Sequence, residues 1–222
     1  MLPETQPATL GPAEPDRDCP YCPRLVAFRQ EWRAKEPGWH NAPVPTFGPS
    51  DARLLIVGLA PGLRGANRTG RPFTGDYAGL LLYRTMLEFG FARGVYEARV
   101  DDGLALADAA IVNAVRCVPP ENKPLPLEIG TCRQFLSATI AEMPQVKAIL
   151  ALGRIAHEST VTALGARRAA APFGHAARHA IAGFALFDSF HCSRYNTNTG
   201  RLTEDMFRQV FASIRAFLDQ QP

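Results

Sequence analysis

The chain has 222 residues, a formal net charge of +3, 46% hydrophobic residues and 20% charged residues. This composition excludes a disordered chain, a fibrous protein and a disulfide-dense mini-protein. No apolar run reaches the roughly 18 residues that a membrane span needs, and Met1 to Thr5 lack a signal-peptide pattern, so we expect a soluble, cytoplasmic protein with no membrane partner. The length fits a single domain, which we predict to cover residues 1–222.

The first 50 residues are rich in proline, since they hold ten of the 19 prolines. Proline fixes φ and lacks a backbone N–H, so this stretch cannot be mostly strand or long helix. We expect residues 1–50 to wrap a core formed by the rest of the chain. One helix, from about Arg24 to Ala34, is predicted within this stretch because its apolar residues recur at roughly helical spacing.

From Arg53 onward, short apolar runs alternate with stretches of helical periodicity. This alternation is typical of a parallel sheet covered by helices on both faces. The predicted strands are residues 54–57, 110–115, 148–152 and 184–187. The predicted helices are residues 77–89, 127–142, 155–164 and 203–218. In such a sheet the ligand lies beyond the carboxyl ends of the strands, where polar or Gly-rich segments follow in this sequence.

Four of the five cysteines have a spacing typical of a metal site. Cys19 and Cys22 form a C-x-x-C motif, and Cys117 and Cys132 are separated by fourteen residues. In a cytosolic chain, metal or cluster ligation is more common than a structural disulfide. Four thiolates suit either zinc or an iron–sulfur cluster, and spacing alone does not distinguish them. Four unrelated buried thiols are the remaining interpretation.

Two other segments point to an anionic ligand. Residues 153–201 contain six arginines and only two acids, a pattern that fits either a polyanion-binding face or an ordinary solvated face. The loop 58–76 has four glycines by Gly70, which let the backbone approach a ligand and offer N–H groups to an anion. This loop fits neither a P-loop nor the dinucleotide fingerprint.

Several motifs taken together resemble the iron–sulfur uracil-DNA glycosylases, and among them the family-five or type B enzymes. These motifs are GLAPG, GxPFTGD, VNAVRCVPP, ALG and HCSRYN, together with the C-x-x-C and Cys132. The resemblance covers nearly the whole chain from Cys19 onward. It implies a three-layer α-β-α sandwich around a four-stranded parallel sheet. It also implies a DNA repair enzyme that flips uracil out of the helix and hydrolyses its N-glycosidic bond.

The resemblance makes four cysteines the ligands of a structural [4Fe-4S] cluster: Cys19, Cys22, Cys117 and Cys132. It also places a DNA wedge at Arg194 and Tyr195, because relatives insert a side chain into the base stack there. The predicted phosphate contacts are Arg64, Arg68, Arg71 and Arg201. We expect the protein to act on DNA as a monomer associated with the nucleoid.

A pocket for a flipped base needs an aromatic face, an amide and a hydrogen-bond donor. Phe73, by resemblance, supplies the ring, and Asn113, at the end of an apolar run, can pair with the base edge or position water. His191 follows the fourth predicted strand and is placed to donate to a base carbonyl as negative charge develops on the departing base. The Gly-rich loop completes the predicted base-binding set with Gly58, Ala60 and Gly62.

Asp76 is the candidate for orienting water or stabilising the sugar, because it is the only nearby carboxylate of the loop; it fits equally well as the N-cap of the next helix. The sequence also departs from the family pattern. Leu59 stands where family-four enzymes have an acid, the loop reads GLAPG where type B enzymes more often read GLAPA, and Cys192 replaces a common proline. A less polar pocket is expected to admit hypoxanthine or xanthine as well as uracil.

Two other classes of function stay open at this point. The same four cysteines suit an iron–sulfur redox or electron-transfer protein, and they also suit a zinc-stapled nucleic-acid-binding module without catalysis. Neither class explains why Phe73, Asp76, Asn113 and His191 should gather at the ends of strands.

Overall fold

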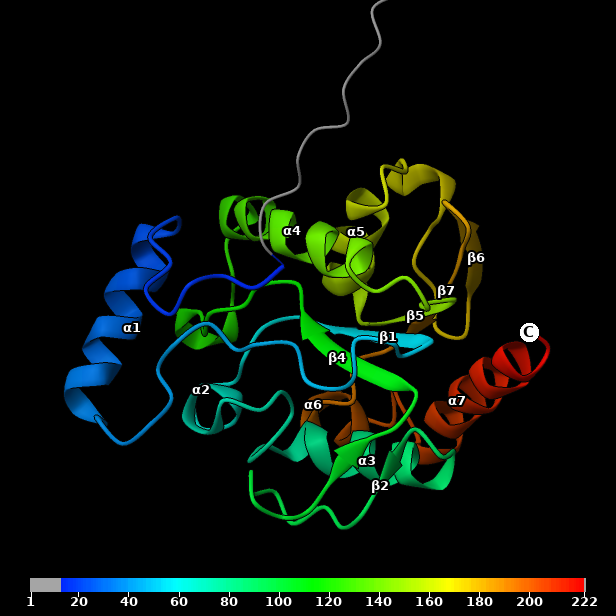
Figure 1. Cartoon of the computed structure of the whole chain (residues 1–222), viewed down its shortest axis with the longest axis horizontal. Coiled ribbons are helices and arrows are strands. Elements are labelled where there is room, and N and C mark those ends of the chain that lie inside the picture. Colours follow the sequence, from blue (N-terminus) through cyan, green and yellow to red (C-terminus); the bar gives the residue numbers. More distant parts are fainter. Residues whose placement is uncertain (1–12, 222) are drawn as a thin grey trace, which may run out of the picture.

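The structure, a computed structural model, describes residues 13–221, so residues 1–12 of the predicted N-terminal wrap lie outside the described part. Its centre is a five-stranded sheet with the strand order β4-β1-β5-β7-β6 (Figure 1). The strands are β1 (Leu54–Gly58), β4 (Ala109–Asn113), β5 (Ala148–Leu152), β6 (Arg178–Ile181) and β7 (Phe184–Ser189). The first four strands of this order are parallel, and β6 pairs antiparallel with β7.

Helices cover both faces of the sheet, because its central strands are apolar on both sides. In β1, Leu54 and Ile56 belong to one buried apolar cluster, whereas Leu55 and Val57 belong to another. Successive side chains of a strand point to opposite faces, so each cluster is one face of the sheet with the helices packed on it. Helices α3 (Tyr77–Glu88) and α7 (Glu204–Asp219) cover the first face, and α4 (Pro126–Ala141) and α5 (Arg154–Ala163) cover the second.

The predicted helices and strands are confirmed to within a few residues. Thr203 caps the last helix, since the backbone N–H of Met206 donates to Thr203 Oγ1 at 3.1 Å. Helix α1 (Pro23–Lys35) matches the helix expected in the proline-rich segment. It is tied to the start of α4 by Arg24, whose guanidinium contacts both carboxylate oxygens of Glu128 at 2.7 Å. No helix within residues 13–221 is long and apolar enough to cross a membrane.

The sheet has one strand more than the four predicted. Strand β6 was not predicted because its residues, Arg178 to Ile181, alternate between exposed and half-buried and include two basic side chains, as an edge strand can. A second, small sheet pairs β2 (Ala92–Arg93) with β3 (Ala105–Leu106), each too short to give a sequence pattern.

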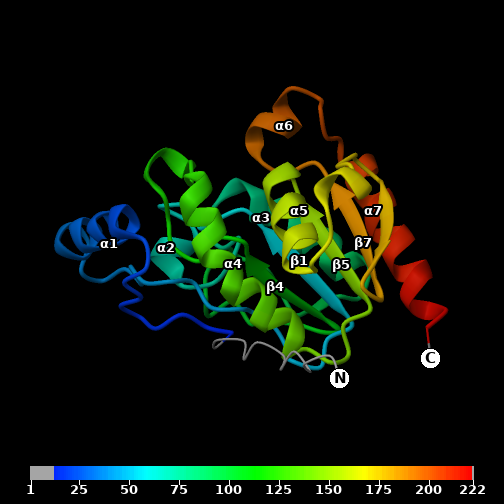
Figure 2. The same ribbon diagram turned by 90° about the horizontal axis from the view of Figure 1, so that it is seen from above.

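The opposite edge of the sheet is strand β4. Its Ile111 exchanges two backbone hydrogen bonds, of 2.9 and 2.7 Å, with Phe47 of the proline-rich segment. At the carboxyl ends of the parallel strands lie the short helices α2 (Ala66–Thr69) and α6 (Arg194–Asn198). Figure 2 shows α6 standing out from the body beyond the end of β7.

Candidate active site

A cavity of about 440 Å³ at the carboxyl ends of the strands brings together the four side chains predicted to cluster there. These are Phe73, Asp76, Asn113 and His191. The rest of its lining consists of Leu59, Ala60, Pro61, Gly62, Ala66, Tyr77, Ala78, Asn122, Ser193 and Arg194. Segments remote in sequence therefore form one hollow, as predicted. The sequence did not single out Tyr77, Asn122 or Ser193, although Ser193 lies within the HCSRYN motif.

Asn113 is the last residue of β4 and is buried, with 3% of its surface exposed. Its neighbour on β1 is Gly58. A Cβ atom at Gly58 would overlap the Asn113 Oδ1 atom and would lie 2.9 Å from Phe73 Cζ. Gly58 was predicted to bind the base, but it does not line the cavity. Its lack of a side chain instead makes room for the Asn113 amide and the Phe73 ring. Ala60 and Gly62 do line the cavity.

Phe73 presents its ring to the cavity from a strained backbone. Its φ of +52° lies in the left-handed region, which costs a residue other than glycine about 1–3 kcal/mol. The ring lies 5.9 Å from the imidazole of His191, centroid to centroid, with 30° between the two planes. Strain of this kind persists only where surrounding contacts hold it.

His191 follows β7 and borders the cavity. Asn196 Nδ2 donates a hydrogen bond of 2.8 Å to the His191 carbonyl oxygen, which fixes the backbone at this point. Burial lowers the pKa of His191 to about 4. The imidazole is therefore neutral at pH 7 and keeps one N–H to donate.

Asp76 caps a helix, as one of its two predicted roles requires, and it also lines the cavity. It is the N-cap of α3, where its Oδ1 accepts a hydrogen bond of 3.2 Å from the Gly79 backbone N–H, and its carboxylate also lines the cavity. Burial raises the pKa of Asp76. The loop needs glycine next to this carboxylate, because a Cβ atom at Gly65 would lie 2.7 Å from Asp76 Oδ2.

The four cysteines predicted as ligands lie around one small pocket between α1, the segment after β4, and α4. None of the four forms a disulfide within residues 13–221. Two donors point at their sulfurs: Arg29 Nη1 lies 3.5 Å from Cys117 Sγ, and the Arg116 backbone N–H lies 3.3 Å from Cys132 Sγ. Burial raises the pKa of Cys117 to about 11 and that of Cys132 to about 12.

The spacing of these sulfurs bears on what they can hold. A single tetrahedral zinc, with Zn–S bonds of about 2.3 Å, requires sulfurs about 3.8 Å apart. Among residues 13–221, no three cysteine sulfurs lie within 4.8 Å of one another. The arrangement therefore fits a larger group held between the thiolates better than a single ion.

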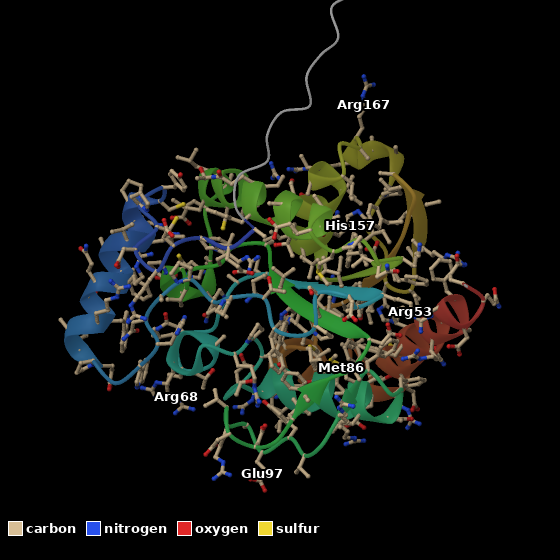
Figure 3. The ribbon with its side chains drawn as sticks, viewed as in Figure 1. Arg53, Arg68, Met86, Glu97, His157 and Arg167 are labelled. Atoms are coloured by element: carbon tan, nitrogen blue, oxygen red, sulfur yellow. The ribbon has the colours of Figure 1, made fainter. Side chains whose placement is uncertain are left out.

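The sequence did not indicate a second cluster of polar side chains, formed by His157, His179 and Asp188. His157 Nδ1 lies 2.6 Å from Asp188 Oδ1, and its Nε2 lies 2.7 Å from the Ala171 carbonyl oxygen (Figure 3 labels His157). His179 Nε2 is 3.4 Å from the same carboxylate. Asp188 and the Ala171 carbonyl engage both ring nitrogens of His157, so neither nitrogen is free to bind a metal. Against the opposing effect of burial, hydrogen bonding to Asp188 raises the pKa of His157, and the contact joins α5 to β7.

Most of the residues predicted to contact DNA lie on the surface. Tyr195 on α6 is 71% exposed, and the Arg194 guanidinium lies 5.0 Å from the centre of the Tyr77 ring at the cavity. Arg201 packs over Phe190 at 4.6 Å. Arg64 and Arg68 are exposed near α2, where Figure 3 shows Arg68. Within the described part of the chain, none of the four arginines forms an ion pair: Arg64, Arg68, Arg194 and Arg201.

The prediction that Arg71 contacts a phosphate is wrong. Its side chain is buried, and its Nη1 and Nη2 donate to the two oxygens of Asp102 at 2.9 and 2.7 Å. A guanidinium that is enclosed and paired in this way cannot reach DNA. The sequence did not show this because Asp102 lies 31 residues further along the chain.

Comparison with known proteins agrees with this geometry. The model of the uracil DNA glycosylase superfamily matches residues 45–215. A type-5 uracil-DNA glycosylase of Thermus thermophilus is 45% identical over 204 residues, which cover 89% of this chain and 92% of the relative. A type-5 enzyme of Pyrobaculum aerophilum is 36% identical and covers 90% and 88% of the two chains. A type-4 uracil-DNA glycosylase of Thermotoga maritima is 38% identical but covers only 49% of each chain. With a family model that spans most of its length and relatives this similar, the chain belongs to the uracil-DNA glycosylase superfamily.

Proposed function

We propose that this chain is a monofunctional DNA glycosylase that removes uracil from DNA by hydrolysing the N-glycosidic bond. The observation that carries the proposal is the convergence of Phe73, Asn113 and His191 on one cavity of about 440 Å³. A base inside a duplex cannot be reached, so it must be flipped into such a pocket. The exposed Arg194 and Tyr195 lie beside the cavity, where they can contact the DNA that the base leaves.

The cavity supplies a partner for each part of the reaction. The Phe73 ring stacks on the flipped base, and the Asn113 amide pairs with its polar edge. As water adds to C1′ of the sugar and the glycosidic bond breaks, the bonding electrons leave with the base, and the proton that the water loses ends on the base anion. The neutral His191 imidazole donates its N–H to a base carbonyl oxygen and stabilises this negative charge. Asp76 orients the attacking water or stabilises the positive sugar.

We further propose that Cys19, Cys22, Cys117 and Cys132 hold a [4Fe-4S] cluster with a structural role. The proposal is supported by four cysteines around one pocket, none of them in a disulfide, and by the finding that no three of their sulfurs lie within 4.8 Å of one another. When bound, the cluster supplies four covalent cross-links. These join the proline-rich segment to the loop after β4 and to α4, and closing such long loops constrains the unfolded chain. An electron-transfer role for the cluster would leave the base-sized cavity without a purpose.

The test of the proposed function uses a DNA duplex with one uracil at a defined position. Release of the base leaves an abasic site, and hot alkali then cleaves the strand there. We expect strand scission with uracil and none with the undamaged duplex. Duplexes that carry hypoxanthine or xanthine extend the test to the wider base range that the missing acid at Leu59 suggests. Strict selectivity for uracil would contradict that wider range, and no scission on any duplex would contradict the function itself.

The variant Asp76→Asn distinguishes the role of this side chain as a helix cap from its proposed role in catalysis. Asparagine caps helices as well as aspartate does, so the thermal midpoint of unfolding should change little. If the carboxylate orients water, the single-turnover rate of uracil release should fall by about 10²-fold. The matched control is Asp76→Ala, which removes the cap as well and should lower both stability and rate. An unchanged rate in Asp76→Asn would show that Asp76 is only a helix cap.

The variant Tyr195→Ala tests the wedge on α6. An inserted side chain fills the gap left by the flipped base, a gap that a single strand does not have. We expect the rate on duplex DNA to fall by about tenfold and the rate on single-stranded DNA to change by less than about twofold. Leu127→Ala on α4, which removes another exposed apolar side chain, should change neither rate. Equal losses on both substrates would rule out a wedge.

A further inference from the structure

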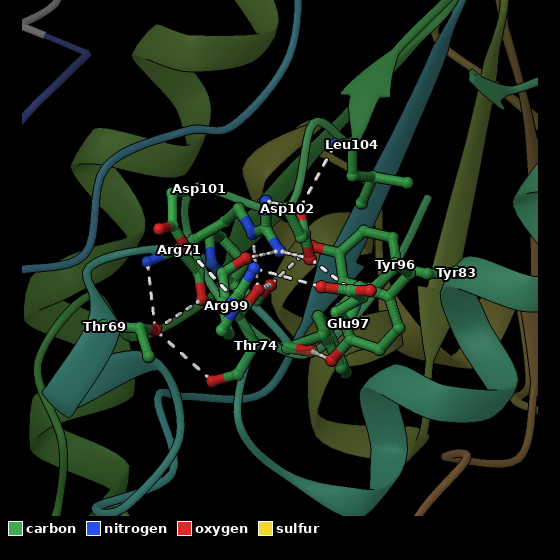
Figure 4. Close-up of polar contacts among 12 residues, drawn as sticks. Thr69, Arg71, Thr74, Tyr83, Tyr96, Glu97, Arg99, Asp101, Asp102 and Leu104 are labelled. Carbon is green, nitrogen blue, oxygen red and sulfur yellow. Dashed lines mark hydrogen bonds and ion pairs between the residues drawn. The ribbon is translucent and has the colours of Figure 1, made fainter. Parts of the chain in front are cut away.

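Figure 4 shows a cluster of polar contacts around Arg71 and Asp102, neither of which lines the cavity. Its centre is the ion pair of Arg71 and Asp102, whose side chains are 7% and 0% exposed. Asp102 also accepts hydrogen bonds from the backbone N–H groups of Glu97 at 3.0 Å and Leu104 at 3.1 Å. The carboxylate therefore ties the segment before Phe73 to the loop 94–104, which connects β2 and β3.

This cluster holds three consecutive residues of the loop at the cavity. Tyr83 Oη donates to the Pro72 carbonyl oxygen at 2.5 Å, and Tyr96 Oη donates to the Phe73 carbonyl oxygen at 2.9 Å. Arg71 Nε donates to Thr74 Oγ1 at 2.7 Å. Each hydrogen bond fixes one residue of the segment in which Phe73 adopts its left-handed backbone.

The two tyrosines are themselves held by the ion pair. Their ring centres are 4.6 Å apart, and the Arg71 guanidinium lies 5.8 Å from the Tyr83 ring and 5.9 Å from the Tyr96 ring. Burial raises the pKa of Tyr96 to about 12, so its hydroxyl keeps the proton that it donates. The hydrogen bond from Glu97 to Asp102 fixes the backbone directly after Tyr96.

Helix α3 closes the cluster from the other side. A Cβ atom at Gly79 would overlap both the Phe73 carbonyl oxygen and Tyr96 Oη. The absence of a side chain at this position lets the helix backbone, the carbonyl and the hydroxyl meet. The Phe73 carbonyl is thus enclosed by a helix and a tyrosine, and rotation of its peptide group is blocked.

We propose that Tyr96, held by the Arg71–Asp102 ion pair, is a positioning residue that sets the Phe73 ring for stacking on the flipped base. The inference rests on the proposed function, because Phe73 has to be the stacking ring. It assigns a task to the loop 94–104, which contributes no residue to the cavity lining. The alternative is that the cluster only stabilises the fold, and the two roles predict different results.

The variant Tyr96→Phe removes the hydroxyl and keeps the packing of the ring on Tyr83. We expect the single-turnover rate of uracil release to fall by about fivefold, the loss that one hydrogen bond explains. Affinity for a duplex with an abasic-site analogue should stay within about twofold of wild type, since that duplex has no base for Phe73 to stack on. Thr85→Val is the matched control. It removes a buried hydroxyl that bonds only within α3, to the Leu81 carbonyl oxygen, and should not change the rate.

A double-mutant cycle with Phe73→Ala shows whether Tyr96 acts through Phe73. In the Phe73→Ala background, Tyr96→Phe should change the rate by less than about twofold, because the ring that it positions is gone. Three results would overturn the proposal. Tyr96→Phe could lower the rate by the same factor in both backgrounds, it could weaken binding to the abasic duplex in parallel with the rate, or it could leave the rate unchanged. If wild type releases no base from any duplex, the proposed function fails and this role fails with it. If the wild type is active and the effects of Tyr96→Phe and Phe73→Ala on the rate are additive, only the positioning role is overturned.

Discussion

The variant His191→Ala is expected to reduce the single-turnover rate of uracil release by about 10²–10³-fold at pH 7, the usual loss when a donor to a developing anion is removed. The reason is the position of the imidazole on the cavity wall, where a neutral N–H can donate to the departing base. Duplex affinity and the thermal midpoint of unfolding should change much less than the rate. Rapid mixing with enzyme in excess of a uracil-containing duplex measures the chemical step directly.

The pH dependence of this effect follows from the low pKa. With a pKa of about 4, His191 holds its extra proton only in acid, and from pH 6 to pH 8 it stays neutral. The ratio of the wild-type rate to the His191→Ala rate should therefore be constant across this range. If the ratio changed with an apparent pKa near the ordinary histidine value of about 6.5, the donor would be an imidazolium. That result would contradict the mechanism.

The second large effect is expected when one cysteine of the four-cysteine pocket is replaced. Cys132→Ala should abolish stable binding of iron and acid-labile sulfide. It should also lower the free energy of unfolding by about 2–5 kcal/mol, the usual cost of losing a covalent cross-link in a small domain. The reason is that Cys132 is the thiol that α4 contributes to the pocket, so its loss frees α4 from the cross-linked segments.

Cys192→Ala is the matched control for this substitution. Cys192 is also a buried, free cysteine, but it lies outside the pocket. Iron and sulfide analysis, the visible absorption spectrum and thermal unfolding should all distinguish the two variants. Wild-type protein that carries one zinc ion, or no metal, would contradict the cluster proposal.

The parts of the fold that the sequence predicts are those with a strong local pattern. The runs at residues 54–57 and 148–152 are buried on both faces, so their continuous apolar character indicates central strands. The edge strand β6 has no such run, because one face of it meets solvent. Arg178 and His179 form a strand because they pair with β7. The sequence around these residues has no pattern that indicates this pairing.

The residues of the candidate site also fall into those that a local sequence pattern predicts and those that it does not. Asn113 and His191 could be predicted because one ends and the other follows an apolar strand, and the carboxyl ends of parallel strands meet at one edge. Arg71 was misplaced because its partner Asp102 comes from the loop between β2 and β3, which has no periodicity to position it. Gly58 was assigned to the lining, whereas only the register of β1 with β4 shows that it lies against Asn113. These features depend on tertiary contacts, which spacing along the chain does not encode.

The backbone pairing of Phe47 with Ile111 has a consequence for the behaviour of the protein in solution. Strand β4 ends the sheet, and an open edge of this kind offers its backbone groups to a strand of another molecule. The proline-rich segment occupies part of that edge, and prolines 43, 45 and 49, which flank Phe47, have no N–H with which to extend the pairing. The segment thereby protects the strand that carries Asn113 from intermolecular sheet growth and aggregation.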